Sequence, residues 1–304
     1  MDPSCIFSEW RRLCAAGLNN RAAAAALALT EAELLATACG GLATRLVPDT
    51  HAFLAAAQSL GRAKYVVRND HAVLERAGSI EALRPAPGGA IEARSSSFTL
   101  RLSGSPAGSA FALEEPCATG TKRSLQLFDR AGTTLVKIVL RDESAAEAFA
   151  AAVASLRHGG RADEAPAPGQ RGPAPGPRGT GAEPVRPDAL AAFLRRAAES
   201  SVALRLRVSN AGAALETVTP IRRVKRSSRA PWINVLDPEL DVHLYEARIR
   251  SLVAGDAAAH GADDRRWLHW CADEASVALS AEVPRALADW VLATNGLREP
   301  VVPD

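Results

Sequence analysis

The sequence predicts an α+β protein that arose by tandem duplication, in which each half has a large antiparallel sheet with flanking helices. Three observations support this fold class. Residues 6–60 have helical spacing of apolar side chains, and from Tyr65 onward the sequence changes to short runs of β-prone residues. The second half of the chain then repeats the residue spacing of the first, so both halves are expected to have the same architecture.

The helical region carries its own start and stop residues. Thr30 and Glu33 have the spacing of a capping box, which predicts a helix running to about Cys39, where two glycines follow. A second helix is expected over 51–60, after the sequence Pro-Asp-Thr and before Gly61.

The β-rich region ends in a hairpin between Leu125 and Arg141. Its two apolar runs are separated by the tetrad 129–132, whose Asp and Gly supply the turn conformations that β-branched residues resist. An Ala-rich helix is expected from Ala145 to Leu156. The earlier strands of this half are expected at Tyr65–Asn69, Phe98–Leu102 and Ser109–Leu113.

A stretch rich in proline and glycine separates the halves at 158–187. It has almost nothing apolar to bury, so burial cannot offset the entropy cost of ordering it, and the composition predicts a flexible linker. The expected organisation is a first repeat at 1–157, the linker at 158–187 and a second, shortened repeat at 188–304.

The duplication is inferred from an ordered series of matched intervals. The hairpin recurs faintly at Trp267–Leu279, and a final helix at Pro284–Thr294 matches the one that ends the first half. The copies are unequal, because only 188–199 is helical before the second sheet. The matched intervals are Asn69 to Glu75 with Asn210 to Glu216, Glu75 to Ile80 with Glu216 to Ile221, Ile80 to Arg101 with Ile221 to His243, and Arg101 to Leu125 with His243 to Leu268.

Charge and cysteine content narrow the function classes. The formal net charge is +2, from 36 basic and 34 acidic residues, so bulk electrostatics do not favour a nucleic acid partner. No signal peptide or bilayer-length apolar segment is expected, which predicts no membrane insertion and a cytoplasmic location. The five cysteines form no C-x-x-C pair and are expected to be reduced thiols: Cys5, Cys14, Cys39, Cys117 and Cys271.

Sequence motifs of common enzymes do not identify a catalytic residue. The chain has no phosphate-binding glycine loop, no H-E-x-x-H and no nucleophile elbow. The glycines of 172–181 lie in the Pro-rich segment rather than between a strand and a helix. We therefore predict no catalytic residue from motifs alone.

Three stretches resemble a known family. They are Val67–Gly78, the hairpin with Gly120–Ser124 before it, and Pro231–Pro238 leading to Val242-His243-Leu244. Together they resemble the hemin-degrading factor family, the HemS-like cytoplasmic heme-utilisation proteins of bacteria. The resemblance implies two similar α+β halves with heme held in a cleft between them. Some members are heme-degrading enzymes, and others carry imported heme to a separate oxygenase.

The resemblance suggests which cations contact heme. Arg101 stands at the position of a family arginine that lies on one face of the heme, although a solvated strand arginine is the alternative. The basic run Arg222, Arg223 and Lys225 resembles the family's run before its Trp-x-Asn strand. It could bind the two heme propionates or form a solvated loop.

The iron ligand is not identified. The family's axial His matches Asp188 here, and Asp at a helix start is expected to be an N-cap rather than an iron ligand. The helices that follow in the family are expected to be missing after Glu199. His243 is the repeat-mate of Arg101 and a candidate heme contact, with a structural role in the sheet as the alternative. Weaker candidates are His51, His71, His158, His260 and His269, the last expected to face the core.

Three functional hypotheses follow. The first is a heme carrier that receives heme from an importer and passes it to a heme oxygenase. The second is a heme-degrading, oxygenase-like enzyme that releases iron, which requires a defined axial ligand. The third is a paralogue that keeps the fold but acts as an interaction module without heme.

Overall fold

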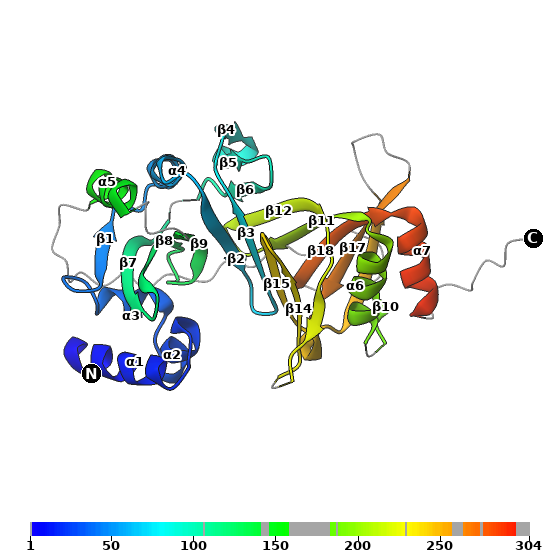
Figure 1. Cartoon of the computed structure of the whole chain (residues 1–304), viewed down its shortest axis with the longest axis horizontal. Coiled ribbons are helices and arrows are strands. Elements are labelled where there is room, and N and C mark those ends of the chain that lie inside the picture. Colours follow the sequence, from blue (N-terminus) through cyan, green and yellow to red (C-terminus); the bar gives the residue numbers. More distant parts are fainter. Residues whose placement is uncertain are drawn as a thin grey trace, which may run out of the picture. The chain divides into compact units, whose positions relative to one another are not determined.

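The computed structural model describes residues 2–105, 107–140, 146–157, 183–186, 188–228, 230–256, 264–273 and 276–295 (Figure 1). The chain forms two compact units. Unit 1 comprises Met1–Val66, Ala77–Ser96 and Arg101–Gly172. Unit 2 comprises Val67–Arg76, Ser97–Leu100 and Pro173–Asp304, so it takes two segments from the first half of the chain. The strands form two large antiparallel sheets, as the sequence predicted for an α+β protein.

Unit 1 begins with helices and continues with strands. Its helices are α1 (Pro3–Ala15), α2 (Asn20–Ala26), α3 (Glu31–Ala36), α4 (Thr50–Ser59) and α5 (Ala146–Leu156). Its strands are β1 (Ala43–Leu46), β2 (Ala63–Arg68, which ends in unit 2), β4 (Ala82–Ala86), β5 (Ala90–Arg94), β7 (Ser109–Cys117), β8 (Gly120–Phe128) and β9 (Thr134–Leu140). Strand β6 (Thr99–Leu102) is shared between the units.

The predicted hairpin is the pair β8 and β9. The main strand order of unit 1 is β1-β7-β8-β9-β2, with antiparallel neighbours. In the turn, Asp129 accepts hydrogen bonds from the amide of Thr133 through its side chain, at 2.8 Å, and from the amide of Gly132 through its carbonyl, at 3.1 Å. Gly132 has φ +73°, a conformation that favours glycine.

The first three helices cover one face of this sheet. Trp10 and Leu34 lie in a buried cluster with Phe111 and Phe128 of β7 and β8. The predicted capping box is confirmed, since Thr30 Oγ1 accepts from the amide of Glu33 at 3.2 Å and the Glu33 carboxylate accepts from the amide of Thr30 at 2.8 Å. Helix α3 is therefore fixed at its start and packed along its length.

Unit 2 contains the remaining elements. Its helices are α6 (Ala189–Ser200) and α7 (Arg285–Thr294), with a 3-10 turn η3 (Glu246–Arg248). Its strands are β3 (Ala72–Gly78, all but its last two residues), β10 (Glu183–Pro184), β11 (Ala203–Ser209), β12 (Ala213–Pro220), β13 (Val224–Arg226), β14 (Trp232–Asp237), β15 (Leu240–Tyr245), β16 (Ser251–Asp256), β17 (Arg265–Cys271) and β18 (Val277–Pro284).

The strand order of unit 2 confirms the duplication. The run β10-β16-β17-β18-β11 repeats the run β1-β7-β8-β9-β2 of unit 1, strand for strand. Helix α6 precedes β11 as α4 precedes β2, and α7 follows β18 as α5 follows β9. Helix α7 packs on β17 and β18 and also contacts α6 (Figure 1). The faint hairpin at Trp267–Leu279 is the real counterpart of β8 and β9.

The two copies share strands inside unit 2. Strand β3, from the first copy, pairs with β15, from the second, in the register Leu240 with Arg76 to Leu244 with Ala72. Asn69 Nδ2 donates to the carbonyl of Ser209, and Asn210 Nδ2 donates to the carbonyl of Arg68, both at 3.1 Å. Each asparagine of the predicted pair thus contacts the residue before its mate.

No helix lies between α6, which ends at Ser200, and β11, which begins at Ala203, as predicted. By element order, α6 is the counterpart of α4 and β10 is the counterpart of β1. Helices α1–α3 precede β1, so their second-copy counterparts would precede β10. That part of the chain, with nearly all of the predicted linker, lies outside the described residues. The predicted repeat boundaries stay a prediction.

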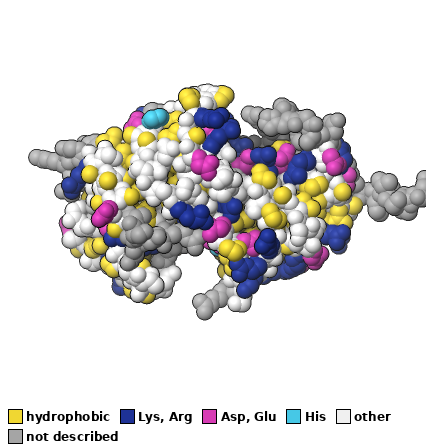
Figure 2. Space-filling view, turned by 45° about the horizontal axis from the view of Figure 1, so that its top comes forward, with side chains coloured by type: hydrophobic (Ala, Val, Ile, Leu, Met, Phe, Trp, Pro, Cys, Tyr) yellow, Lys and Arg dark blue, Asp and Glu magenta, His cyan; other side chains and the backbone are white. Residues whose placement is uncertain are grey.

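Two further expectations concern the whole chain. None of the five cysteines, all of which lie in the described ranges, forms a disulfide. Within the described ranges, none of the helices combines the length and the hydropathy needed to cross a membrane. On the face in view in Figure 2, Lys and Arg side chains are interspersed with acidic and hydrophobic ones.

Candidate heme-binding face

Two of the predicted residues, Lys225 and His243, lie on one half-exposed sheet face of unit 2. Strands β13, β14 and β15 align Lys225 with Asn234 and Asn234 with His243. Because register partners in adjacent strands project to the same side, these side chains form a row, which we call the His243 row. Val73 of β3 continues the row beyond His243.

His243 makes a defined hydrogen bond in this row. Its Nδ1 lies 2.7 Å from Oδ1 of Asn234. Asn234 was part of the Trp-x-Asn motif in the sequence, but no role had been assigned to it. The contact orients the imidazole within the sheet, and it leaves Nε2 without a hydrogen bond to any described residue. Whether His243 contacts a ligand stays a prediction.

Aromatic rings flank the His243 row. Trp232 and Tyr245 are register partners one row away, and their ring centroids are 5.0 Å apart with an interplanar angle of 59°. Both rings are partly exposed. The period of two along β14 and β15 was the pattern that could have placed this pair beside His243.

The opposite side of the same strands is fully buried. Ile233 and Val235 of β14 and Leu244 of β15 have no exposed surface. Alternation of buried and half-exposed residues therefore fixes which side chains face outward. A one-residue slip would move His243 into the core, so burial of the opposite face also holds the His243 row in place.

The basic run before β14 is anchored through its backbone. The amides of Arg222 and Arg223 each donate to the Asp237 carboxylate at 3.0 Å, and Arg223 Nε lies 3.8 Å from Asp237 Oδ1. The side chains of Arg222, Arg223 and Lys225 are exposed. Of these three cations, the structure brings only Lys225 into the His243 row.

Asp188 occupies the predicted N-cap position of helix α6, but its side chain does not cap the helix. It adopts a left-handed conformation, with φ +69°, and its side chain makes no capping hydrogen bond. The carboxylate instead pairs with Arg226, which also binds Glu246 at 2.7 Å. These hydrogen bonds raise the pKa of Arg226. The charge of Asp188 is thus compensated by a strand arginine rather than by the helix amides.

Arg101 lies in unit 1. It projects from β6 between the buried residues Leu100 and Leu102, and its Nη2 donates to the carbonyl of Pro87 at 2.9 Å. Its side chain is partly exposed. Whether Arg101 contacts a ligand stays a prediction.

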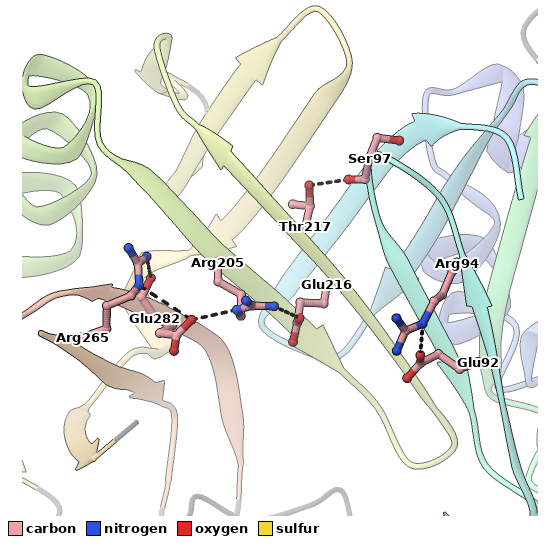
Figure 3. Close-up of polar contacts among 8 residues, drawn as sticks. All are labelled: Glu92, Arg94, Ser97, Arg205, Glu216, Thr217, Arg265 and Glu282. Carbon is pink, nitrogen blue, oxygen red and sulfur yellow. Dashed lines mark hydrogen bonds and ion pairs between the residues drawn. The ribbon is translucent and has the colours of Figure 1, made fainter. Parts of the chain in front are cut away.

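A second polar face lies on the other sheet of unit 2. Arg205 of β11 binds Glu216 at 2.6 Å and Glu282 at 2.7 Å, and Arg265 adds a contact to Glu282 at 3.8 Å (Figure 3). Burial lowers the pKa of Arg205, but the hydrogen bonds to Glu216 and Glu282 raise it by more, so the net shift of the pKa is upward. The network balances its own charges, so it favours a structural role.

His269 lies on this second face rather than in the core. It stacks on Trp267 with a centroid distance of 5.9 Å, and its Nδ1 lies 2.8 Å from the Ser280 hydroxyl. The neighbouring Trp270, on the opposite side of the strand, is the core residue. Burial, followed by the charge of Arg207, lowers the pKa of His269.

The other histidines are placed as follows. His51 is exposed on α4, and the carbonyl of His71, just before β3, accepts from the amide of Tyr245 at 2.8 Å. His158 and His260 lie outside the described residues. Among the described residues, no group of three or more His, Cys, Asp or Glu side chains is arranged to hold a metal ion.

Comparison with known proteins identifies the first copy. Residues 28–156 match the model of the haemin-degrading HemS.ChuX domain. The chain is 33% identical over 130 residues to the hemin transport protein HmuS of Yersinia pestis and 31% identical over 130 residues to the hemin transport protein HemS of Yersinia enterocolitica. Each match covers 43% of this chain and 38% of the relative, so the matched segment spans less than half of these relatives.

Solved structures match nearly the whole chain. Holo-PhuS, a heme-binding protein from Pseudomonas aeruginosa, is 27% identical, with a TM-score of 0.82 and coverage of 94% of both chains. The heme degrading enzyme ChuS of Escherichia coli O157:H7 has the same fold, with a TM-score of 0.79 at 19% identity over 97% of this chain and 99% of that one. The chain therefore has the duplicated fold of these proteins, and residues 28–156 carry the similarity to the HemS.ChuX domain.

Proposed function

We propose that this protein binds heme as its cargo and carries it in heme utilisation. The observation that carries the proposal is the similarity to holo-PhuS, described as heme-binding, over 94% of this chain at 27% identity. A likeness of this extent includes both copies of the duplicated unit. We therefore expect heme to be the ligand of the duplicated fold.

The chemistry of the His243 row fits such a cargo. Heme requires an apolar surface for the macrocycle, a ligand for iron and cations for the propionates. Trp232 and Tyr245 supply aromatic surface, His243 has an unengaged ring nitrogen, and Lys225 supplies a cation in the same row. Arg222 and Arg223 precede Lys225 with exposed guanidinium groups.

We further propose that the protein works in the cytoplasm, receives heme from an importer and passes it to a heme oxygenase. The names of the relatives as hemin transport proteins support transport as the role. The mixed surface charge gives no reason to add a nucleic acid partner.

Titration with hemin, followed in the Soret region, tests the proposal. We expect a saturable change with one heme per chain, and weaker binding in Arg101→Ala, because this substitution removes a cation that the family resemblance places at the heme. Arg130→Ala removes an exposed arginine of the β8–β9 turn in the same unit and should bind as the wild type does. Absence of saturable binding would reject heme handling and favour the interaction-module hypothesis.

The same complex distinguishes a carrier from an enzyme. With an electron donor in air, a carrier should keep its Soret band, and transfer of heme to an apo-acceptor should follow. Loss of the band together with release of iron would instead indicate a heme-degrading enzyme. We expect the band to persist, because the names of the relatives as hemin transport proteins favour a carrier.

A further inference from the structure

We propose that His243 is the axial ligand of the heme iron, through Nε2, and that Asn234 is its positioning residue. The inference rests on the proposed heme binding and names the ligand within it. No family resemblance assigns this role to His243, because the expected ligand position is Asp188.

The hydrogen bond between His243 and Asn234 determines the tautomer. An amide oxygen can only accept a hydrogen bond, so Nδ1 of His243, 2.7 Å from Asn234 Oδ1, carries the proton. In the neutral ring the lone pair then lies on Nε2, the nitrogen that makes no hydrogen bond to the described residues. This is the arrangement that metal-binding histidines have, with a carbonyl oxygen as the acceptor behind the ring.

Rigid strands hold both residues. His243 and Asn234 are register partners in adjacent strands, and each has buried neighbours along its own strand, such as Val242 and Leu244 beside His243 and Ile233 beside Asn234. A ligand on a strand whose opposite face is buried loses little additional freedom on binding. His243 is therefore preorganised, whereas a histidine in a loop would have to be ordered.

Charges on the same face give heme an orientation. Lys225 lies beyond Asn234 at the β13 side of the His243 row. Asp241 and Glu75 are register partners in the next row, on the other side of His243 from Trp232 and Tyr245. Propionates should avoid these carboxylates, so we place them toward β13, with the macrocycle over the aromatic pair.

Other described ligands fit less well. His269 faces the Ser280 hydroxyl, which can donate or accept and so does not fix a tautomer, and Arg207 adds a positive charge beside the ring. Asp188 is engaged by Arg226. His51 lies exposed on helix α4, and no polar group of the described residues orients it.

The test uses the full chain reconstituted with hemin and a spectroscopic readout. Resonance Raman of the ferrous complex should show an iron–histidine stretching band in the wild type and in His269→Gln. The band should disappear in His243→Gln, which keeps a side chain able to donate to Asn234 but cannot ligate as imidazole does. Hemin affinity should fall at least tenfold, and added imidazole should restore a histidine-like spectrum.

Asn234 is tested by the same band. Asn234→Ala removes the acceptor behind Nδ1, so the band should move to lower frequency while heme remains bound. Asn234→Asp places a carboxylate there and should move it to higher frequency. A role in the sheet alone would change stability but not the order of these frequencies.

The outcomes separate the two proposals. If the wild type binds no heme, the proposed function fails. If it binds heme and His243→Gln keeps the iron–histidine band, or His269→Gln loses it, the assignment of His243 is overturned. Should His243→Gln fail to fold by urea unfolding, His243→Met substitutes a thioether ligand, and an unchanged spectrum in that variant would equally overturn the assignment.

Discussion

At the residue scale, Asn69 and Asn210 show how the duplication is held together. Each accepts backbone amides within its own turn, His71 and Ala72 for Asn69, and each donates to a backbone carbonyl beside its mate. Asn69 Nδ2 also lies 3.1 Å from the carbonyls of Val277 and Ala278. The matched positions of Asn69 and Asn210 in the two copies therefore correspond to residues that hold the copies together.

Replacing Asn69 should destabilise unit 2. Asn69→Ala removes the turn acceptor and the donor to three carbonyls, and we expect a loss of about 2–3 kcal/mol in the free energy of unfolding. Asn69→Asp keeps the acceptor for the two amides but places a carboxylate against the carbonyls, so it should rescue little. Urea unfolding measures both, and a loss below about 0.5 kcal/mol in Asn69→Ala would contradict this account.

His269 should make stability depend on pH. Its pKa is lowered in the fold, so below the unfolded value of 6.5 the unfolded chain binds a proton that the folded chain resists. Stability is therefore expected to fall as the pH decreases from about 6.5 to the folded pKa and to be unaffected above pH 7.5. In His269→Gln this part of the decrease should be absent when urea unfolding is compared at pH 5.5 and 7.5. An identical decrease in both proteins would assign the effect to other groups.

At the element scale, the β8–β9 turn is fitted to the start of helix α3. A Cβ added to Gly132 would lie 2.4 Å from Thr30 Oγ1, and the Gly132 carbonyl accepts from the amide of Ala32 at 3.4 Å. The hairpin and the capping box were both predicted from sequence, since each depends on a local pattern. Their contact was not predicted, because no local pattern records which turn meets which helix.

This contact can be measured with two glycine substitutions. Gly17→Ala changes a glycine with φ +92° and open space around it, so it should cost only about 1 kcal/mol for the backbone conformation. Gly132→Ala adds the collision with Thr30 to a similar backbone cost, and we expect at least 1 kcal/mol more. Equal losses of stability for the two variants would show that a side chain at position 132 does not collide with Thr30.

Asp188 shows where reasoning from local pattern fails. An Asp at the start of a helix usually accepts hydrogen bonds from the first helix amides, but its carboxylate can instead pair with a cation from another strand. Arg226 is 38 residues away in the sequence and directly follows the basic run Arg222, Arg223 and Lys225. Pairing of this kind depends on the tertiary fold, so the sequence pattern alone favoured the wrong partner for Asp188.

At the scale of the whole molecule, unit 2 is built from both copies. Strand β3 pairs with β15 through Ala72–Arg76, although the two strands are more than 160 residues apart in the sequence. The duplication, the strand types and the helix that ends each copy followed from periodicity and spacing. Sharing of β3 did not, because the sequence contains no information about which of several exposed strand edges pairs with which.

Separating the copies should therefore expose an unpaired edge. Residues 1–157 expressed alone would leave β3 without β15, and we expect aggregation or poor solubility. Co-expression with residues 183–304 should restore a soluble complex on gel filtration. A monomeric, cooperatively unfolding 1–157 fragment would contradict the importance of the shared strand.

The central claim is that this chain has one specific heme site. The most direct test is a hemin titration of the full chain that follows absorbance and circular dichroism together in the Soret region. A specific site should give an induced dichroic band that saturates at one heme per chain. A linear absorbance increase without an induced band would contradict the claim, because heme that associates nonspecifically has no fixed orientation in the protein.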